Sequence, residues 1–87
     1  MLRVAVISPE RTLYDGEATS VVAPAFDGEV GILIGHAPML TLLGRGTLRV
    51  DREGTEQRFT VAGGFLQVVD NQVRVVTEHA EQAQPSA

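Results

Sequence analysis

Three side chains that could carry chemistry lie close together in the sequence: Asp27, Glu29 and His36. Two carboxylates and an imidazole could bind a metal ion or act as a general acid–base set. Metal sites in small β-barrels usually take two histidines from one strand, as H-x-H, and a more distant third ligand. His36 has no such neighbour, and His79 lies close to the C-terminus. We therefore expect no metal site and no cofactor.

The motifs of the common catalytic sites are also missing from the sequence. There is no G-x-x-x-x-G-K loop to hold phosphates, no G-x-S-x-G nucleophile elbow and no cysteine. The glycines at 44 and 46 are better explained by a turn before a strand than by a nucleotide-binding loop. We expect no catalytic residue and no small-molecule substrate, so the chain is predicted not to be an enzyme.

Composition restricts the classes of partner. The 87 residues suffice for one domain with a single two-layer core. The net charge is −4 and all seven basic residues are arginine, which argues against nonspecific nucleic-acid binding. No apolar run approaches the roughly 20 residues needed to span a bilayer, and residues 1–4 do not resemble a signal peptide. We therefore expect a cytoplasmic chain, or at least one on the cytoplasmic side of whatever it binds.

Apolar and polar residues alternate in a way that predicts short strands along nearly the whole chain. Strands are expected at residues 2–6, 17–23, 47–51, 58–61, 66–69 and 73–76, with turns at 14–16, 52–54 and 70–71. No window shows sustained helical periodicity, although residues 80–84 could form one loose helical turn before Pro85. Strands spaced in this way are typical of an antiparallel sandwich or barrel.

Segment 28–41 combines glycines, a proline and a histidine around a short apolar run. Pro38 cannot donate a hydrogen bond to a strand, so residues 35–38 are predicted to turn at a sheet edge. That turn would carry His36 and present Met39 and Leu40. Two further features are interpreted as structural. The glycines at 63 and 64 favour a bulge or a close approach of the backbone, and core or edge packing is expected for Tyr14, Phe26, Phe59 and Phe65.

The same segment, G-E-V-G-I-L-I-G-H-A-P-M-L-T, closely resembles the N-terminal domain of the epsilon subunit of F-type ATP synthases, where it typically reads G-E-x-G-I-x-P-G-H-A-P-L-L-T. The resemblance continues in one register from about residue 2 to residue 79, through I-S-P-E and L-Y-D-G near the start and V-A-G-G-F-L-Q-V and N-Q-V-R-V-V-T-E near the end. Ile34 stands where the family usually has proline. The resemblance implies an all-β fold, an antiparallel β-sandwich of two stacked sheets, at residues 1–79, followed by a flexible tail at 80–87.

The resemblance also implies a function. The chain would be a non-catalytic rotor subunit of the central stalk that docks the gamma subunit to the c-ring and couples ion translocation to ATP synthesis. It would lie on the cytoplasmic face of the cell membrane as a peripheral protein, and the assembled head would offer the beta subunit as a further neighbour. Whether the enzyme moves protons or sodium ions stays open. The alternative is a free-standing β-sandwich module that binds another protein or a ligand.

Two sets of contact residues follow from the resemblance. Contact with the gamma subunit is expected for Ser8, His36, Met39, Leu40, Thr41 and Leu42. Contact with the c-ring is expected for Asp27, Glu29 and His36, because acids at these positions would complement basic residues in the polar loops of the ring. In most of the family a two-helix domain begins where this sequence ends, so we expect either a short form or a truncated chain.

Overall fold

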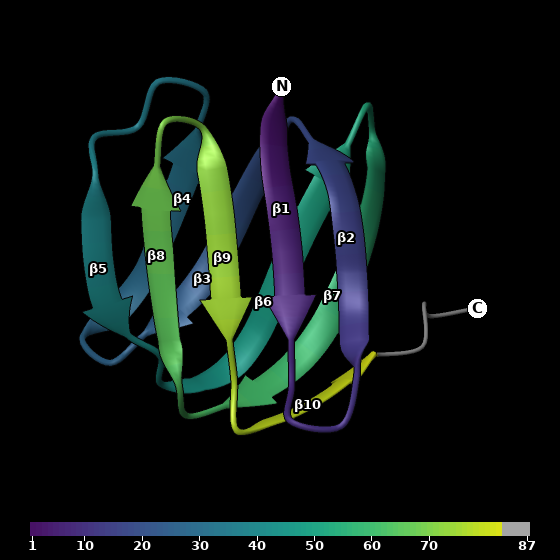
Figure 1. Cartoon of the computed structure of the whole chain (residues 1–87), viewed down its shortest axis with the longest axis vertical. Coiled ribbons are helices and arrows are strands. Elements are labelled where there is room, and N and C mark those ends of the chain that lie inside the picture. Colours follow the sequence, from purple (N-terminus) through teal and green to yellow (C-terminus); the bar gives the residue numbers. More distant parts are fainter. Residues whose placement is uncertain (83–87) are drawn as a thin grey trace.

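The computed structural model describes residues 1–82, which form ten strands and no helix. The strands make two stacked five-stranded sheets (Figure 1). Sheet A, in front in Figure 1, has the order β2-β1-β9-β8-β5, and sheet B has the order β10-β7-β6-β3-β4. The strands are β1 (Leu2–Ile7), β2 (Thr12–Ala18), β3 (Ser20–Ala25), β4 (Gly28–Leu33), β5 (Met39–Leu42), β6 (Arg45–Arg52), β7 (Thr55–Ala62), β8 (Phe65–Val69), β9 (Gln72–Val76) and β10 (His79–Gln82).

The core lies between the sheets and is built by alternation along each strand. In β8, for example, Leu66 and Val68 are buried while their neighbours are exposed. Phe59 of β7 is a fully buried aromatic side chain, and the Tyr14 ring meets it edge-on with centroids 6.3 Å apart. Buried and exposed side chains alternate in this way along a strand that has one face against the core and the other in water. The predicted sandwich of two stacked sheets is confirmed, as are hairpin turns at residues 53–54 and 70–71.

Several local predictions were wrong. Residues 14–16 lie inside β2, where Asp15 pairs with Ala5 of β1, and residues 45 and 46 already belong to β6. The reversal before β2 comes earlier, where the Ser8 hydroxyl donates to the Arg11 carbonyl at 3.1 Å. The sandwich is also not wholly antiparallel, because β1 and β9 pair in parallel. The sequence interval between them holds most of the chain, so the crossing could not be inferred from neighbouring turns.

The described part of the chain ends in a strand, β10, at residue 82. Residues 80–82 therefore do not form the helical turn that the sequence allowed from residue 80. β10 pairs antiparallel with β7, with Ala80 opposite Val61. Thr77, which is buried, holds the crossing from β9 to β10: its amide donates to the Ile7 carbonyl at 2.9 Å and its hydroxyl to the His79 carbonyl at 2.9 Å. The expected domain boundary after residue 79 therefore falls inside β10. The rest of the predicted tail, residues 83–87, lies outside the described residues.

The crossing from β7 to β8 depends on the absence of a side chain at residue 64. Gly64 has φ +102°, and a Cβ there would lie 2.0 Å from the Val76 carbonyl oxygen. Because this oxygen belongs to the backbone, it cannot move aside by a side-chain rotation. This is the close approach that the paired glycines predicted, and it brings Phe65 next to β9.

We predict that Gly64→Ala lowers the free energy of unfolding by more than about 3 kcal/mol, more than most single substitutions cost, or prevents folding. The matched control is Gly31→Ala, because a Cβ at Gly31 would meet nothing within 4 Å. Urea unfolding followed by circular dichroism gives both values. Equal stabilities for the two variants would contradict the steric argument.

Candidate docking surface

β5 and β4 are the edge strands of the two sheets on the same side of the sandwich, and the loop at residues 34–38 joins them (Figure 1). Along β5 the side chains alternate. Leu40 and Leu42 point into solvent and are 70% and 63% exposed, whereas Met39 packs against the core. The predicted gamma-contact residues of β5 therefore divide between the two faces of the strand, because neighbouring side chains on a strand point to opposite sides.

An apolar row crosses the outer face of sheet A from β5 to β1. Leu42 pairs with Phe65, Phe65 with Val76, and Val76 with Ile7. We call these four residues the apolar row. Phe65 is shared by two hollows of about 400 and 340 Å³. One is lined by Leu40, Thr41, Leu42 and Phe65. The other reaches from Phe65 past Ile7 to Ser8 and Pro9.

The row connects predicted residues that the sequence places far apart. Ser8 and Leu42 both lie at the lower end of the sandwich in Figure 1, with Phe65, Val76 and Ile7 between them. Sequence reasoning missed these three as candidate contact residues. The signal was present in β8, where Phe65 has the same phase as the exposed Gln67. An aromatic residue in the polar phase of a strand favours a contact surface over core packing.

His36 lies at the opposite, upper end, in the loop between β4 and β5 (Figure 1). It is half-buried, its amide donates to the Leu33 carbonyl at 3.1 Å, and its Nδ1 lies 2.7 Å from the Ala37 carbonyl oxygen. The loop is joined to the β8–β9 turn by a bond from the Gly35 amide to Asn71 Oδ1 at 2.7 Å. The predicted gamma-contact set therefore extends along the full length of the β5 edge.

The predicted c-ring residues are not all brought together. Asp27 in the β3–β4 turn and Glu29 in β4 lie at the lower end, away from His36 (Figure 1). Glu29 forms an exposed ion pair with Arg49 at 3.4 Å. Beside Asp27, Phe26 is 67% exposed and its amide donates to the Leu42 carbonyl at 3.0 Å. Asp27 thus lies next to one end of the apolar row through Phe26, whereas Glu29 pairs with Arg49 on sheet B. The packing predicted for the aromatic residues holds for Tyr14 and Phe59, whereas Phe26 is strongly exposed.

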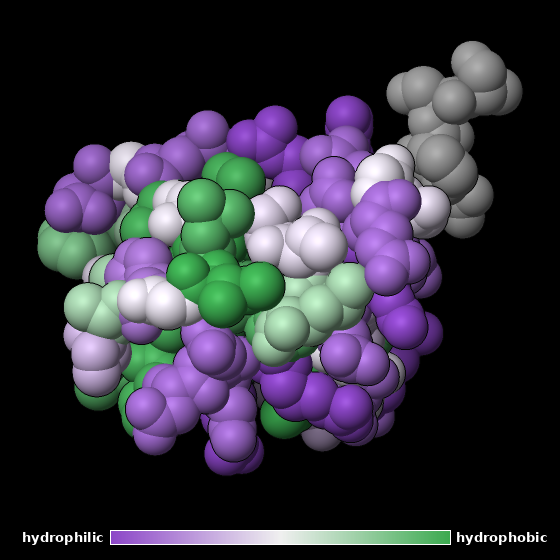
Figure 2. All heavy atoms as spheres, turned by 90° about the horizontal axis from the view of Figure 1, so that it is seen from above, coloured by the Kyte–Doolittle hydropathy of each residue, from purple (hydrophilic) through white to green (hydrophobic). Residues whose placement is uncertain are grey.

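The upper end of the sandwich carries apolar surface as well. Figure 2, which looks onto this end, shows apolar side chains gathered near the middle with polar side chains around them. The exposed apolar residues whose strand ends meet here are Met1, Leu33, Ile34 and Val69. Ile34 is therefore a surface residue of the loop that carries His36.

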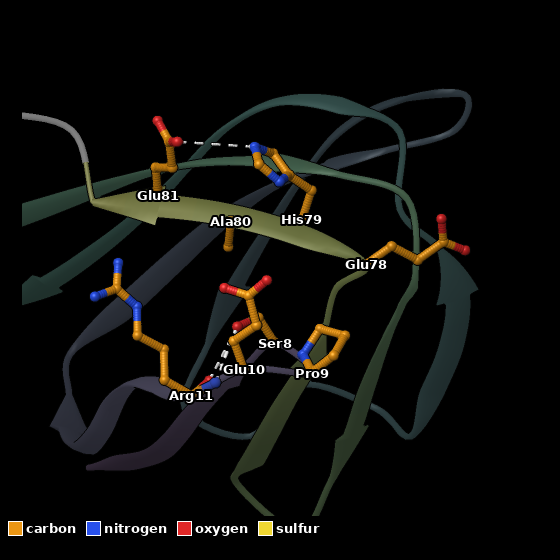
Figure 3. Close-up of a pocket in the computed structure, with 8 residues that line it drawn as sticks. All are labelled: Ser8, Pro9, Glu10, Arg11, Glu78, His79, Ala80 and Glu81. Atoms are coloured by element: carbon orange, nitrogen blue, oxygen red, sulfur yellow. Dashed lines mark hydrogen bonds and ion pairs between the residues drawn. The ribbon is translucent and has the colours of Figure 1, made fainter.

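A polar hollow of about 140 Å³ lies between the 8–11 loop and β10 (Figure 3). The His79 ring and the Glu81 carboxylate lie on one side of β10, joined at 3.9 Å, whereas Ala80 points to the other side, toward Glu10. The titratable groups therefore do not converge on one point. Within residues 1–82, no three His, Cys, Asp or Glu side chains cluster in a way that could hold a metal ion. No helix in the same residues could cross a membrane.

Comparison with models of protein families assigns this chain to one of them. Residues 1–83 match the model of the "ATP synthase, Delta/Epsilon chain, beta-sandwich domain". The chain belongs to this family. Its sequence is also similar to individual proteins named ATP synthase epsilon chain. It is 43% identical over 83 residues to the ATP synthase epsilon chain of a Synechococcus species, covering 95% of this chain and 61% of that one. It is 47% identical over 79 residues to that of Rhodopirellula baltica, covering 91% and 62%.

Two solved ATP synthase structures contain chains with a similar fold. A chain in the Euglena gracilis mitochondrial ATP synthase, described as OSCP/F1/c-ring in rotational state 1, superimposes with a TM-score of 0.86 at 25% identity, covering 93% of this chain and 52% of that one. A chain of the Tetrahymena thermophila mitochondrial ATP synthase central stalk and c-ring gives 0.76 at 18% identity, covering 92% and 65%, which shows a shared fold. The present chain thus spans about 61% of the length of the Synechococcus relative.

For this delta/epsilon sandwich domain, we predict that the two sides of β5 respond differently to charge. The double change Leu40→Asp, Leu42→Asp should alter the free energy of unfolding by less than about 1 kcal/mol, because both side chains are already in water. Met39→Asp should cost more than about 2 kcal/mol, because it removes a core contact and brings a carboxylate against apolar side chains. Thermal and urea unfolding measure both, and the reverse order would contradict the assigned strand phase.

Proposed function

We propose that this chain is the β-sandwich part of an epsilon subunit in the rotor of an F-type ATP synthase. There it docks the gamma subunit to the c-ring, so that ion translocation and ATP synthesis are coupled. The observation that carries the proposal is the apolar row, with Phe65 between two hollows, on a domain of the delta/epsilon family. Relatives named ATP synthase epsilon chain, and a similar chain in an F1/c-ring structure, support the same role.

The gamma subunit is assigned to the apolar row and the β5 edge. Leu40, Leu42 and Phe65 expose apolar surface side by side, and contiguous apolar patches of this kind mark interaction sites on soluble domains. An aromatic side chain between two hollows has the character of an interface anchor. Ser8 and Thr41 border the hollows, and His36 extends the contact to the upper end. Met39 supports this surface from within the core instead of touching the partner.

The c-ring is assigned to the lower end, at Asp27 and Glu29. Both acids are exposed, and Asp27 directly follows Phe26, whose amide donates to the Leu42 carbonyl. Because Arg49 already pairs with Glu29, Asp27 supplies the larger share of the attraction to basic loops of the ring. His36 is removed from this second set because it lies at the other end of β4. Contact with the beta subunit in the assembled head, and a peripheral position on the cytoplasmic face of the cell membrane, complete the proposal.

No step of this function requires chemistry by the chain itself. Transmission of torque requires a stiff body, and in both sheets every strand is hydrogen-bonded to its neighbours around one core cluster. The alternative of a free-standing β-sandwich module differs in one respect that can be measured. It predicts no specific affinity for the gamma subunit or the c-ring.

We predict that Leu40→Asp, Leu42→Asp weakens binding to purified gamma subunit by at least about 30-fold. Truncation or polar replacement of central interface residues commonly costs 1–2 kcal/mol or more each, and tenfold in affinity corresponds to about 1.4 kcal/mol. Surface plasmon resonance against immobilised gamma measures the loss.

The control for this measurement is Thr47→Asp, Thr55→Asp, which adds the same two charges at exposed positions of sheet B. It should bind gamma like the unchanged chain. If both double variants bind equally well, gamma does not use the β5 edge. If the unchanged chain binds neither the gamma subunit nor the c-ring, the alternative function, a free-standing β-sandwich module, is correct.

For the c-ring, we predict that Asp27→Lys weakens binding of the chain–gamma complex to detergent-solubilised rings by up to about fivefold, and that Asp27→Lys, Glu29→Lys weakens it further. Exposed ion pairs are worth about 0.2–1 kcal/mol each, so a modest loss is expected. Raising the salt concentration should reduce the difference between variants, because a Debye length of about 8 Å screens exposed charges. Affinity that responds neither to the charge changes nor to salt would exclude this contact.

A further inference from the structure

The loop at residues 34–38 crosses from the edge of sheet B to the edge of sheet A without strand pairing of its own. It holds His36 and begins with Ile34 directly after Leu33, and both of these apolar residues are exposed. Inside residues 1–82, one hydrogen bond of its backbone reaches an element other than β4 and β5. This is the bond from the Gly35 amide to Asn71 Oδ1, at 2.7 Å.

Asn71 is well suited to hold this loop. It lies in the two-residue turn between β8 and β9, where Asp70 and Asn71 both have positive φ, +49° and +62°. Asparagine tolerates this conformation better than most residues, and its short side chain carries a carbonyl acceptor. The Asn71 backbone carbonyl also accepts from the Arg3 amide at 2.8 Å. One residue therefore joins the turn, the start of β1 and the 34–38 loop.

We propose that Asn71 is a positioning residue that fixes the conformation of the His36 loop, and that this pre-organises the upper part of the docking surface. Gly35 has φ +86° in a turn that the bond from the His36 amide to the Leu33 carbonyl closes, and the Asn71 acceptor fixes this turn relative to the β8–β9 hairpin. A loop ordered before binding does not lose that conformational freedom when the partner arrives. The binding consequence rests on the proposed function, whereas the effect on the loop does not.

The test compares three variants of the full 87-residue chain by amide hydrogen exchange in NMR. Asn71→Gly keeps positive φ but removes the acceptor, and the Gly35 amide should then exchange about five- to tenfold faster, the factor expected from one lost hydrogen bond. Asn71→Asp keeps both the turn and an acceptor, and should retain slow exchange. Asp70→Gly changes the neighbouring turn residue, for which no bond to the loop is present within residues 1–82, and should leave Gly35 unchanged.

Core amides such as those of Val68 and Val73 report global stability, so a change confined to the loop is distinguishable from general weakening. Unchanged Gly35 exchange in Asn71→Gly, or equal acceleration in Asp70→Gly, would overturn the proposal. A second measurement uses purified gamma subunit, for which Asn71→Gly should bind about three- to tenfold more weakly and Asn71→Asp normally.

The two measurements separate this proposal from the proposed function. If loop exchange accelerates but gamma affinity is unchanged, while Leu40→Asp, Leu42→Asp still weakens binding, the pre-organising role is wrong and the docking surface stands. If the unchanged chain does not bind gamma at all, the docking function fails, and hydrogen exchange alone decides whether Asn71 positions the loop.

Discussion

The structure depends on the burial of one apolar face of each sheet against the other. Fully buried valines and leucines from both sheets, together with Ile32, form one core cluster with Phe59, and this packing determines which side of every strand faces water. A one-residue slip in register would turn the core residues of a strand outward. The same constraint places Leu40 and Leu42 outside and Met39 inside, so the exposed apolar surface of β5 is a direct consequence of the core.

Sheet order then determines which outward side chains become neighbours. The parallel pairing of β1 with β9 places Ile7 beside Val76, and the β8–β9 hairpin places Phe65 on the other side of Val76. Gly64 makes that hairpin's start possible, because its missing side chain leaves room for the Val76 carbonyl. The apolar row is therefore assembled from three separate parts of the sequence by backbone pairing across sheet A.

Surface charge has a smaller part in the fold. The ion pairs Arg3–Asp15 and Arg49–Glu29 are exposed, and pairs of this kind contribute little to stability. The Arg49–Glu29 pair has a second consequence at the lower end, because it leaves Asp27 as the acid there without an ion-pair partner within residues 1–82. In the proposed function, apolar contact is assigned to the gamma subunit and charge to the c-ring, and the residues that carry them lie on different parts of the domain.

The sequence by itself determined the all-β class and two of the hairpin turns, because alternation and turn residues act over a few positions. Alternation left a sandwich and a barrel open, and the two stacked sheets followed from the family resemblance. The G-H-A-P segment likewise indicated the family. The sequence did not determine which face of β5 carries Met39, the strand at residues 79–82 or the exposure of Phe65. These features depend on which strands pair across the whole chain. Only the tertiary structure placed His36 and Asp27 at opposite ends, since the length of β4 separates residues that lie close together in the sequence.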